Sequence, residues 1–285
     1  MGAMPAEPVN DASLDAKHQR LLSCLRQMGS AVLAYSGGVD STLVLAAAAG
    51  ARRKSADGLR LLAVTTDSPT NTREEVEQAR TLAAAIGIEH IILATNELET
   101  PGYAENPANR CYLCKQTLYP LCRDVARQRG LAWVADGVNC DDLSDYRPGL
   151  RAATEQGVRH PLVEAGLSKA EVRELSRRYG LPTAEMPASP CLSSRFPYGT
   201  RITEQALAQV AAAEAALREL GFRELRVRYY GSRARVEIAA QEHGRLAQAA
   251  VAQAASRAVM DAGFSEVELA AEPLRSGSLN EALRR

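Results

Sequence analysis

Short apolar runs alternate with amphipathic stretches through the first half of the chain. The apolar runs, which have the length of buried strands, lie at 31–35, 61–65, 89–93 and 132–135. The amphipathic stretches, which repeat apolar residues at helical spacing, lie at 40–49, 73–86 and 113–129. Strands that alternate with helices are typical of a parallel sheet covered by helices on both faces. The pattern therefore predicts an α/β domain over residues 21–185.

A different order of elements follows the segment 186–200, which reads MPASPCLSSRFPYGT. Its prolines predict an ordered, non-helical linker, and this linker carries Cys191. We therefore expect a small α+β domain at 201–272, a loose tail at 273–285 and a flexible N-terminus at 1–20. The elements predicted in the small domain are a helix at 204–220, strands at 225–229 and 234–238, a helix at 241–262 and a strand at 264–269.

Polar loops follow the predicted strands of the first domain. They read SGGVDS, TDSPT, ATNELET and DGVNCDD. Ligands of such folds bind beyond the carboxyl ends of the strands, so these loops are the expected site. A further helix is predicted at 168–179, where Ser168 and Glu171 have the spacing of a capping box.

The loop SGGVDS begins at Ser36, between an apolar strand and an alanine-rich helix. Gly37 and Gly38 let the backbone bend and approach a ligand closely. Free N–H groups of the turn and of the new helix then point at an anion. Ser41 adds a second hydroxyl group, and Asp40 can hold Mg²⁺. The lysine of the GxxxxGK[ST] phosphate loop is absent. The alternative is a plain glycine turn before a buried helix.

The charge balance, the apolar runs and the cysteine count of the chain argue against some classes of function. The chain of 285 residues carries 34 basic and 34 acidic residues, and this balance argues against a protein that holds long nucleic acid through its overall charge. No apolar run is long enough for a transmembrane helix, so we expect no membrane partner. We also expect no signal peptide, because no basic segment precedes an apolar one near the N-terminus. Six cysteines in such a chain suggest reduced thiols and a cytoplasmic location.

Three cysteines are candidates for chemistry. Cys111 and Cys114 form a CxxC pair, which fits a redox pair, half of a zinc site or two core cysteines. Cys191 lies in PCLSSR, and three thiolates of this kind can hold an iron–sulfur cluster with one open iron position. Structural roles are expected for the other cysteines, which are Cys24, Cys122 and Cys140.

Arginines alternate with apolar residues in two neighbouring strands of the small domain. The runs LRVRY and RARVEI are joined by a short turn that contains Gly231, so they are predicted to pair as a hairpin. A period of two places the charged residues on one face. This face is either an ordinary solvated surface or, because the arginine fork suits phosphate, a phosphate site. The charged residues are Arg226, Arg228, Arg233, Arg235 and Glu237.

Several segments together resemble a known family. SGGVDS matches the SGGxDS signature of the PP-loop ATP pyrophosphatases, which cleave ATP between the α and β phosphates and form an adenylated intermediate. With NRCYLCK, DGVNCDD, RPGLRAATEQGV, PASPCLSSRFPYGTRIT and RELRVRYYGSRARVEI, the chain resembles the LarE family from about Leu21 to Leu269. That family consists of ATP-dependent sulfur transferases that build the nickel-pincer cofactor of lactate racemase. Its substrate is pyridinium-3,5-biscarboxylic acid mononucleotide, whose carboxylates are adenylated and converted to thiocarboxylates.

The resemblance implies two possible sulfur sources. One branch of the family uses a single cysteine of the CLSSR segment as a sacrificial donor and leaves dehydroalanine. Another branch has three cysteines and holds a [4Fe–4S] cluster. Cys111, Cys114 and Cys191 are all present here, which points to the cluster branch. The alternative is that Cys191 acts alone, since about 80 residues separate it from the pair.

The resemblance also assigns expected roles around ATP, Mg²⁺ and the substrate. Adenine is expected near Ala34 and Thr65, and Mg²⁺ on Asp40 with Asp142 as a helper. Structural alternatives are a turn cap for Asp142, a solvated side chain for Lys115 and an acid partner for Arg195. The residues expected to bind ATP are Ala34, Ser36, Gly37, Gly38, Val39, Asp40, Ser41, Thr65 and Asp142. The residues expected to hold the substrate's phosphate are Arg226 and Arg228, with Lys115 and Arg195 as helpers. The expected catalytic residues are Asp40, Cys111, Cys114 and Cys191.

Two rival functions share the ATP loop. A PP-loop tRNA thiolase would also use ATP and cysteines, and an ammonia-using amide ligase would need no cysteine. The expected partners are the small-molecule mononucleotide, cofactor-assembly proteins and further copies of the chain in a multiple of three.

Overall fold

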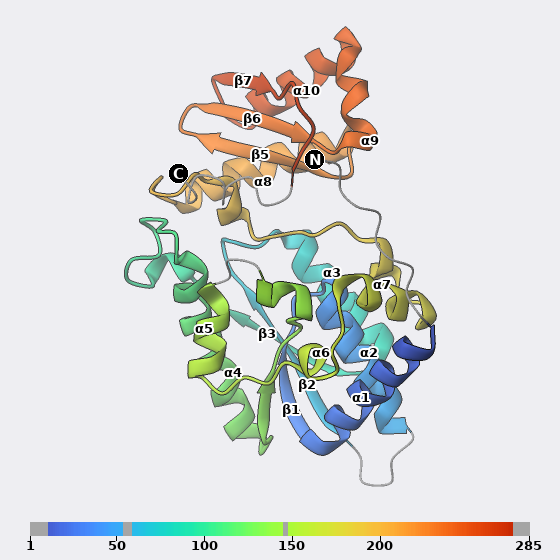
Figure 1. The fold of residues 1–285 in the computed structure, drawn as a ribbon. Helices are drawn as coiled ribbons and strands as arrows, with labels where there is room; N and C mark the ends of the chain where they lie inside the picture. The colour runs from blue at the N-terminus through green and yellow to red at the C-terminus, as the bar shows by residue number, and fades with distance from the viewer. Residues whose placement is uncertain (1–10, 54–58, 145–147, 276–285) are drawn as a thin grey trace. The chain divides into compact units, whose positions relative to one another are not determined.

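The computed structural model describes residues 11–53, 59–144 and 148–275 (Figure 1). The chain divides into two compact units, and each contains more than one stretch of sequence. The first unit consists of Met1–Asp67, Arg73–Thr95 and Cys111–Ser189. The second unit consists of Ser68–Thr72, Asn96–Arg110 and Pro190–Arg285. In the part of the chain that is described, no helix has the length and apolar character needed to cross a membrane.

The first unit is built on a parallel sheet of four strands in the order β3-β2-β1-β4. Each strand lies within about two residues of a predicted apolar run, because buried parallel strands are nearly continuous apolar segments. The α/β prediction is therefore confirmed. The strands are β1 (Ser30–Ala34), β2 (Arg60–Asp67), β3 (Glu89–Ala94) and β4 (Trp133–Ala135).

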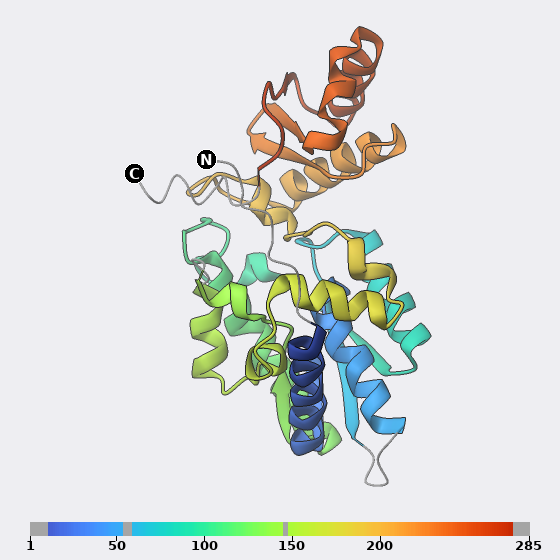
Figure 2. The same ribbon diagram turned by 45° about the vertical axis from the view of Figure 1, so that its right-hand side comes forward.

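Helices cover both faces of this sheet (Figures 1 and 2). Side chains alternate along each strand, so Leu33 of β1 lies in one core and its neighbour Val32 in the other. The first core contains α1 (Asp11–Met28), α2 (Val39–Arg53), α3 (Arg73–Ile86), α6 (Pro161–Glu164) and α7 (Lys169–Arg178). The second core contains α4 (Arg110–Arg129) and α5 (Pro148–Glu155).

The helix α1 corrects the predicted N-terminus. A flexible segment was expected at 1–20, but α1 begins at Asp11 and residues 11–20 are its first turns. Leu14 is fully buried, and Lys17 forms an ion pair with Glu171 at 2.6 Å. These long-range contacts fix the segment, and a prediction from local composition does not include them. Residues 1–10 lie outside the described residues.

The helix α4 contains a proline in its interior. Pro120 has no N–H group, so the carbonyl four residues earlier, that of Gln116, receives no helical hydrogen bond from it. The helix nevertheless runs on to Arg129, and the CxxC pair lies in its first turn.

The second unit contains the predicted α+β module. Its sheet has the order β5-β6-β7, in which β5 and β6 form the predicted antiparallel hairpin and β7 pairs parallel to β6. The single helix predicted at 241–262 is wrong, because the chain breaks it at Gly244 and Gln248. The elements are α8 (Glu204–Glu219), β5 (Leu225–Tyr230), β6 (Arg233–Ile238), α9 (Ala240–His243), the 3₁₀ helix η5 (Gly244–Ala247), α10 (Ala249–Asp261) and β7 (Glu266–Leu269).

Two loop segments of the predicted first domain belong to the second unit. They are 68–72 and 96–110, and the second contains the 3₁₀ helix η1 (Glu97–Glu99). Within this unit, the hydroxyl groups of Tyr103 and Ser193 are 2.9 Å apart, and Asn106 Nδ2 donates to Pro197 O at 2.7 Å. These contacts also fix the predicted linker, whose residues from Pro190 onward are part of the second unit.

The ends of the predicted linker and tail are partly described. The linker contains one short 3₁₀ helix, η4 (Leu192–Arg195), and is otherwise non-helical between residues 186 and 200. At the start of the predicted tail, Leu274 N donates to Ile238 O at 2.9 Å. Residues 276–285 lie outside the described residues, so the prediction of a loose tail is untested there.

Candidate active site

The turn between β1 and α2 has a backbone that requires glycine. Gly37 has φ of 72°, and an added Cβ would lie 3.0 Å from Cβ of Ala79 on α3. Gln78 of the same helix donates to Gly37 O at 3.3 Å. The turn therefore rests directly on α3, and a side chain at Gly37 would be strained in its backbone and crowded by α3.

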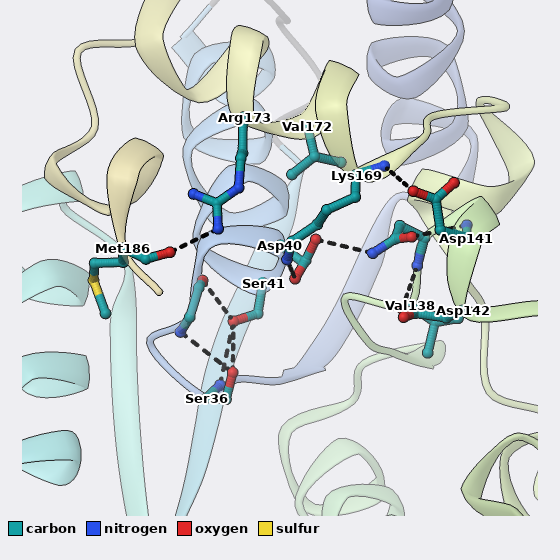
Figure 3. Close-up of polar contacts among 12 residues, drawn as sticks. Ser36, Asp40, Ser41, Val138, Asp141, Asp142, Lys169, Val172, Arg173 and Met186 are labelled. Carbon is teal, nitrogen blue, oxygen red and sulfur yellow. Dashed lines mark hydrogen bonds and ion pairs between the residues drawn. The ribbon is translucent and has the colours of Figure 1, made fainter. Parts of the chain in front are cut away.

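The first turn of α2 carries donors with no helical acceptor. The helical hydrogen bonds begin with Thr42 N, which donates to Gly38 O at 3.0 Å. The amides before Thr42 have no acceptor within the helix, and they lie at its positive end. The hydroxyl groups of Ser36 and Ser41 are 3.1 Å apart and close the turn (Figure 3). This arrangement is suited to bind a phosphate group.

Asp40 has two polar partners, and sequence reasoning missed both. Lys169 Nζ contacts Asp40 Oδ2 at 2.5 Å, and Asn139 Nδ2 donates to Asp40 Oδ1 at 3.1 Å (Figure 3). The Lys169 side chain is 31% exposed and that of Asp40 is 23% exposed, so the pair remains in contact with water. The sequence could have pointed to Lys169 through its position directly after the N-cap Ser168, whose capping box is confirmed. The capping box fixes the backbone at the start of α7, and so it also fixes the position from which the Lys169 side chain extends.

The loop after β4 packs against the first turn of α2. An added Cβ on Gly137 would lie 2.7 Å from Ser41 N, so no side chain fits there. Asp142 Oδ2 accepts a hydrogen bond from Asn139 N at 3.0 Å, which makes it a cap of the 3₁₀ helix η2 (Cys140–Ser144). The structure thus shows the capping alternative for Asp142, and its role toward Mg²⁺ stays a prediction.

Thr65 and Ala34 lie in the sheet beneath the turn. Thr65 Oγ1 donates to Tyr35 O at 2.7 Å, and His90 Nε2 lies 2.8 Å from the same hydroxyl group. Thr65 is buried, as is Ala34 at the end of β1. The hydroxyl group of Thr65 therefore already has two hydrogen-bonding partners within the first unit. The proposed place of Thr65 near adenine stays a prediction.

The CxxC cysteines lie in the first turn of α4. Cys111 is exposed and Cys114 is half-buried. Lys115 Nζ lies 5.3 Å from the centre of the Tyr119 ring. Gly149 of α5 approaches the Lys115 side chain, because an added Cβ would lie 3.2 Å from its Cγ. Lys115 is thus packed within the first unit, and a phosphate contact by it stays a prediction.

Two of the remaining cysteines have the predicted structural role. Cys122 is fully buried on α4, and burial raises the pKa of its thiol to about 12. Burial and a hydrogen bond to Glu164 raise the pKa of Cys24 to about 12. Both thiols are therefore protonated near neutral pH and poor nucleophiles. Cys140 is half-buried in η2.

Cys191 belongs to the second unit, whereas Cys111 and Cys114 belong to the first. Cys191 is half-buried and precedes η4, and its carbonyl oxygen accepts a hydrogen bond from Ser194 N at 2.9 Å. Within the described residues, no group of three or more His, Cys, Asp or Glu side chains is placed to hold a metal ion. Convergence of the three thiols therefore stays a prediction.

Arg195 has an acid partner in the second unit. Its Nε and Nη2 donate to the two carboxylate oxygens of Glu214 on α8, at 2.8 and 2.9 Å. Both side chains are buried, and Arg195 Nη1 also donates to Pro190 O at 2.5 Å. Arg195 thus holds the Cys191 segment to α8, and a phosphate contact by it stays a prediction.

The arginine face of the hairpin is not uniformly solvated. Arg226 and Arg228 of β5 are buried, whereas on β6 Arg233 is exposed and Arg235 is half-buried, and both lie near Glu268. Arg228 pairs with Glu237 at 2.9 Å and donates to Ser194 O at 2.8 Å. The solvated alternative is therefore wrong for the two arginines of β5.

Arg226 is a buried cation that lies directly opposite Glu237 of β6 in the hairpin register. Among the described residues, no carboxylate forms a hydrogen bond or ion pair with it, although it is only 8% exposed. Burial and repulsion from Arg228 and Arg195 lower the pKa of Arg226 to about 10. The charges of Glu237 and Glu214 offset this lowering in part, so the guanidinium keeps its charge near neutral pH and can attract an anion.

Comparisons with known proteins cover nearly the whole chain. The family model described as asparagine synthase matches residues 23–108, which include the SGGVDS turn. A solved structure of NMN synthetase from Francisella tularensis is 18% identical, with a TM-score of 0.47 over 68% of this chain and 84% of that chain.

Two curated relatives are more similar in sequence. An uncharacterized protein of Synechocystis sp. is 43% identical over 95% of this chain and 99% of its own length. The pyridinium-3,5-bisthiocarboxylic acid mononucleotide synthase of Lactiplantibacillus plantarum is 36% identical over 95% of this chain and 96% of its own length. At this identity and coverage, the chain belongs to the LarE family of ATP-dependent sulfur transferases within the PP-loop superfamily.

Proposed function

We propose that this chain adenylates the carboxylates of pyridinium-3,5-biscarboxylic acid mononucleotide and converts them to thiocarboxylates, for the nickel-pincer cofactor of lactate racemase. The name of the L. plantarum relative, a pyridinium-3,5-bisthiocarboxylic acid mononucleotide synthase, supports this substrate class. The structural observation that carries the ATP half of the proposal is the open first turn of α2 beside Asp40.

The turn supplies a site for the two outer phosphates of ATP. The amides before Thr42 and the hydroxyl groups of Ser36 and Ser41 would bind the pyrophosphate. Asp40 fits Mg²⁺, since this ion needs one or two carboxylates besides phosphate and water. Both Asp40 oxygens now contact Asn139 or Lys169, so a metal ion on Asp40 would free the Lys169 ammonium for a phosphate oxygen.

These groups support the proposed adenylation. A carboxylate oxygen of the substrate forms a bond to the α-phosphorus of ATP, the bond from that phosphorus to the bridging oxygen breaks, and pyrophosphate leaves. Negative charge develops on the leaving pyrophosphate, where the amides of α2 and Lys169 would stabilise it. The product is an acyl adenylate, from which a sulfur nucleophile displaces AMP.

The second unit supplies a site for the phosphate of the substrate. Arg226 is buried and makes no direct ion pair among the described residues, and Arg228 is next to it on the same strand face. A phosphate monoester would compensate the charge of Arg226. Lys115 and Arg195 remain weaker candidates, because both already have partners within their own units.

The sulfur source rests on three cysteines. Cys111, Cys114 and Cys191 would hold a [4Fe–4S] cluster, and such a cluster supplies an open iron that can bind sulfide. The fit is one of donor chemistry: three thiols are present, and each is at least partly exposed. The second candidate is Cys191 alone, as a sacrificial donor, because it lies in the matching CLSSR segment.

Pyrophosphate release tests the ATP site. Asp40→Ala should abolish ATP- and substrate-dependent pyrophosphate release, whereas Asp124→Ala, which removes an exposed carboxylate, should leave it unchanged. Release of pyrophosphate at the normal rate by the Asp40 variant would contradict the assignment.

Iron content and protein mass test the sulfur source. Anaerobic reconstitution should give a brown protein, and a colourless protein without iron would remove the cluster. A mass decrease at Cys191 matching one sulfur atom would mean self-sacrifice. An unchanged mass after many turnovers would mean external supply.

Two further experiments separate the rival functions. Triple replacement of Cys111, Cys114 and Cys191 by serine should abolish sulfur transfer, whereas an amide ligase would remain active. Tight binding of tRNA would favour a thiolase of tRNA. We further propose that the chain acts in the cytoplasm as a homo-oligomer with a multiple of three copies, together with cofactor-assembly proteins. The mass of the particle in solution tests the copy number.

A further inference from the structure

A buried carboxylate, Asp136, joins three parts of the first unit. It directly follows β4 and is 5% exposed. Tyr119 OH on α4 donates to Asp136 Oδ2 at 2.8 Å, while His160 Nδ1 lies 2.7 Å from Oδ1 and Val138 N donates to Oδ1 at 3.1 Å. Buried carboxylates with several donors hold their neighbours in fixed positions.

One connection leads from Asp136 to the ATP turn. The next residue is Gly137, which packs so closely on α2 that an added Cβ would lie 2.7 Å from Ser41 N. Two residues further, Asn139 donates to Asp40. The loop 136–139 therefore contacts the part of α2 at which Mg²⁺ and ATP are proposed to bind.

Another connection leads from Asp136 to the cysteines. Tyr119 is 2% exposed and lies five positions after Cys114 on α4, with Lys115 stacked on its ring. Burial raises the pKa of Tyr119, the charge and hydrogen bond of Asp136 raise it further, and Cys122 and then Cys114 add to this. The phenol therefore stays protonated and donates to Asp136 at a position five residues along α4 from Cys114.

We propose that Asp136 is a positioning residue that couples occupancy of the ATP turn to the accessibility of Cys111 and Cys114. The inference rests on the proposed nucleotide site. Mg²⁺ competes with Asn139 for the oxygens of Asp40, and the resulting shift of the loop 136–139 reaches α4 through the Tyr119 hydroxyl group. The coupling is reciprocal, so a change at the cysteines alters the affinity for ATP by the same factor.

The test measures thiol alkylation on the full chain, metal-free and reduced. The probe is Mg²⁺ with α,β-methylene-ATP, which cannot be cleaved between the α and β phosphates. Mass spectrometry follows alkylation of Cys111 and Cys114 with and without the probe, and calorimetry measures probe binding. In the unchanged protein we expect the probe to alter the alkylation rate about fivefold, at the lower end of ordinary coupling.

Tyr119→Phe removes the hydroxyl group and leaves the ring. We expect it to bind the probe but to lose the effect on alkylation. Tyr112→Phe is the matched control, because it removes a hydroxyl group of the same helix that donates to Glu155 and not to Asp136. This control should keep the effect. If Tyr119→Phe fails to fold, His160→Asn removes another partner of Asp136 and should weaken the effect.

The outcomes separate this inference from the proposed function. Probe binding without any effect on alkylation in the unchanged protein overturns the coupling and leaves the ATP site intact. An equal effect in the unchanged protein and in Tyr119→Phe also overturns it. Absence of probe binding in the unchanged protein overturns the proposed ATP site, and the coupling with it.

Discussion

Two ion pairs between a cation and a carboxylate, one in each unit, differ in their exposure to water. Lys169–Asp40 in the first unit retains contact with water, with side chains 31% and 23% exposed. Arg195–Glu214 in the second unit is buried, with side chains 4% and 0% exposed, and its geometry is bidentate. A water-exposed pair can exchange partners at little cost, whereas a buried pair cannot lose one member without leaving an uncompensated charge.

The two ion pairs differ in the role we propose for them: ligand binding for Lys169–Asp40 and support of the fold for Arg195–Glu214. The exposed pair lies beside open helix amides, where an arriving phosphate or metal ion can replace one partner. The buried pair connects the Cys191 segment to α8 and has no such freedom. The following predictions test this division, beginning with the largest expected effect.

Removal of the buried charge at Glu214 should have the largest effect. Glu214→Gln leaves Arg195 uncompensated, so we expect the free energy of unfolding of the second unit to fall by about 3–5 kcal/mol. Glu174→Gln removes an exposed partner of Arg177 and should cost at most about 1 kcal/mol. Urea unfolding measures both values. Equal losses would remove the distinction between the two kinds of pair.

Removal of the exposed ammonium at Lys169 should affect ligand binding and not folding. Lys169→Met should weaken binding of a non-cleavable ATP analogue by about 10–100-fold, or about 1.4–2.8 kcal/mol, while the thermal midpoint changes little. Lys17→Met is the control, because Lys17 pairs with Glu171, which belongs to the same helix α7, and makes no contact with Asp40. Calorimetry measures the affinities. Unchanged binding by the Lys169 variant would contradict a phosphate role.

Arg226 and Arg228 allow a second comparison, between a buried arginine without a direct ion pair and a buried arginine with one. Arg226 makes no direct ion pair among the described residues, so Arg226→Gln should be neutral or should raise the free energy of unfolding by about 1 kcal/mol, while it weakens mononucleotide binding. Arg228→Gln should instead lower stability, because Glu237 loses its partner. Denaturant titrations and binding assays measure the two effects. A loss of stability in both variants would mean that Arg226 is part of the framework.

His160 should give the smallest effect, and it depends on pH. Burial works to lower the pKa of His160, but the hydrogen bond to Asp136 and the charges of Asp136 and Glu164 raise it above 6.5. A raised pKa stabilises the fold fully below the unfolded value, and this contribution is lost as pH rises through the folded value. Stability should therefore decline above pH 6.5 in the unchanged protein and decline less in His160→Asn. Parallel pH profiles of the two proteins would contradict this role.

The fold was predictable where local pattern and burial agree. The helix α3 has the predicted bounds, Arg73–Ile86, because one face carries its apolar residues. The continuous helix at 241–262 was wrong because alanine-rich sequence favours helix everywhere and hides the break at Gly244. The membership of 96–110 in the second unit could not be predicted, because it depends on contacts such as Tyr103 with Ser193, which are 90 residues apart.

The part of the candidate site that one contiguous motif forms was predictable from the sequence. The turn from Ser36 to Ser41 has the expected strand–turn–helix context. Lys169 was missed because its pairing with Asp40 spans 129 residues and a helix start gives it another explanation. Burial of Arg226 was missed because an alternating pattern shows which residues share a face but not what covers that face.

Pro120 gives α4 a mechanical property that matters for its cysteines. Pro120 removes the backbone hydrogen bond to the carbonyl oxygen of Gln116. This position lies between the turn that carries Cys114 and the half of the helix whose residues Cys122 and Val125 are buried in the core. Tilting of the cysteine-bearing end about this point breaks one backbone bond fewer than in an uninterrupted helix. The missing bond would thus act as a joint next to the proposed cluster ligands, and Pro120→Ala would stiffen it.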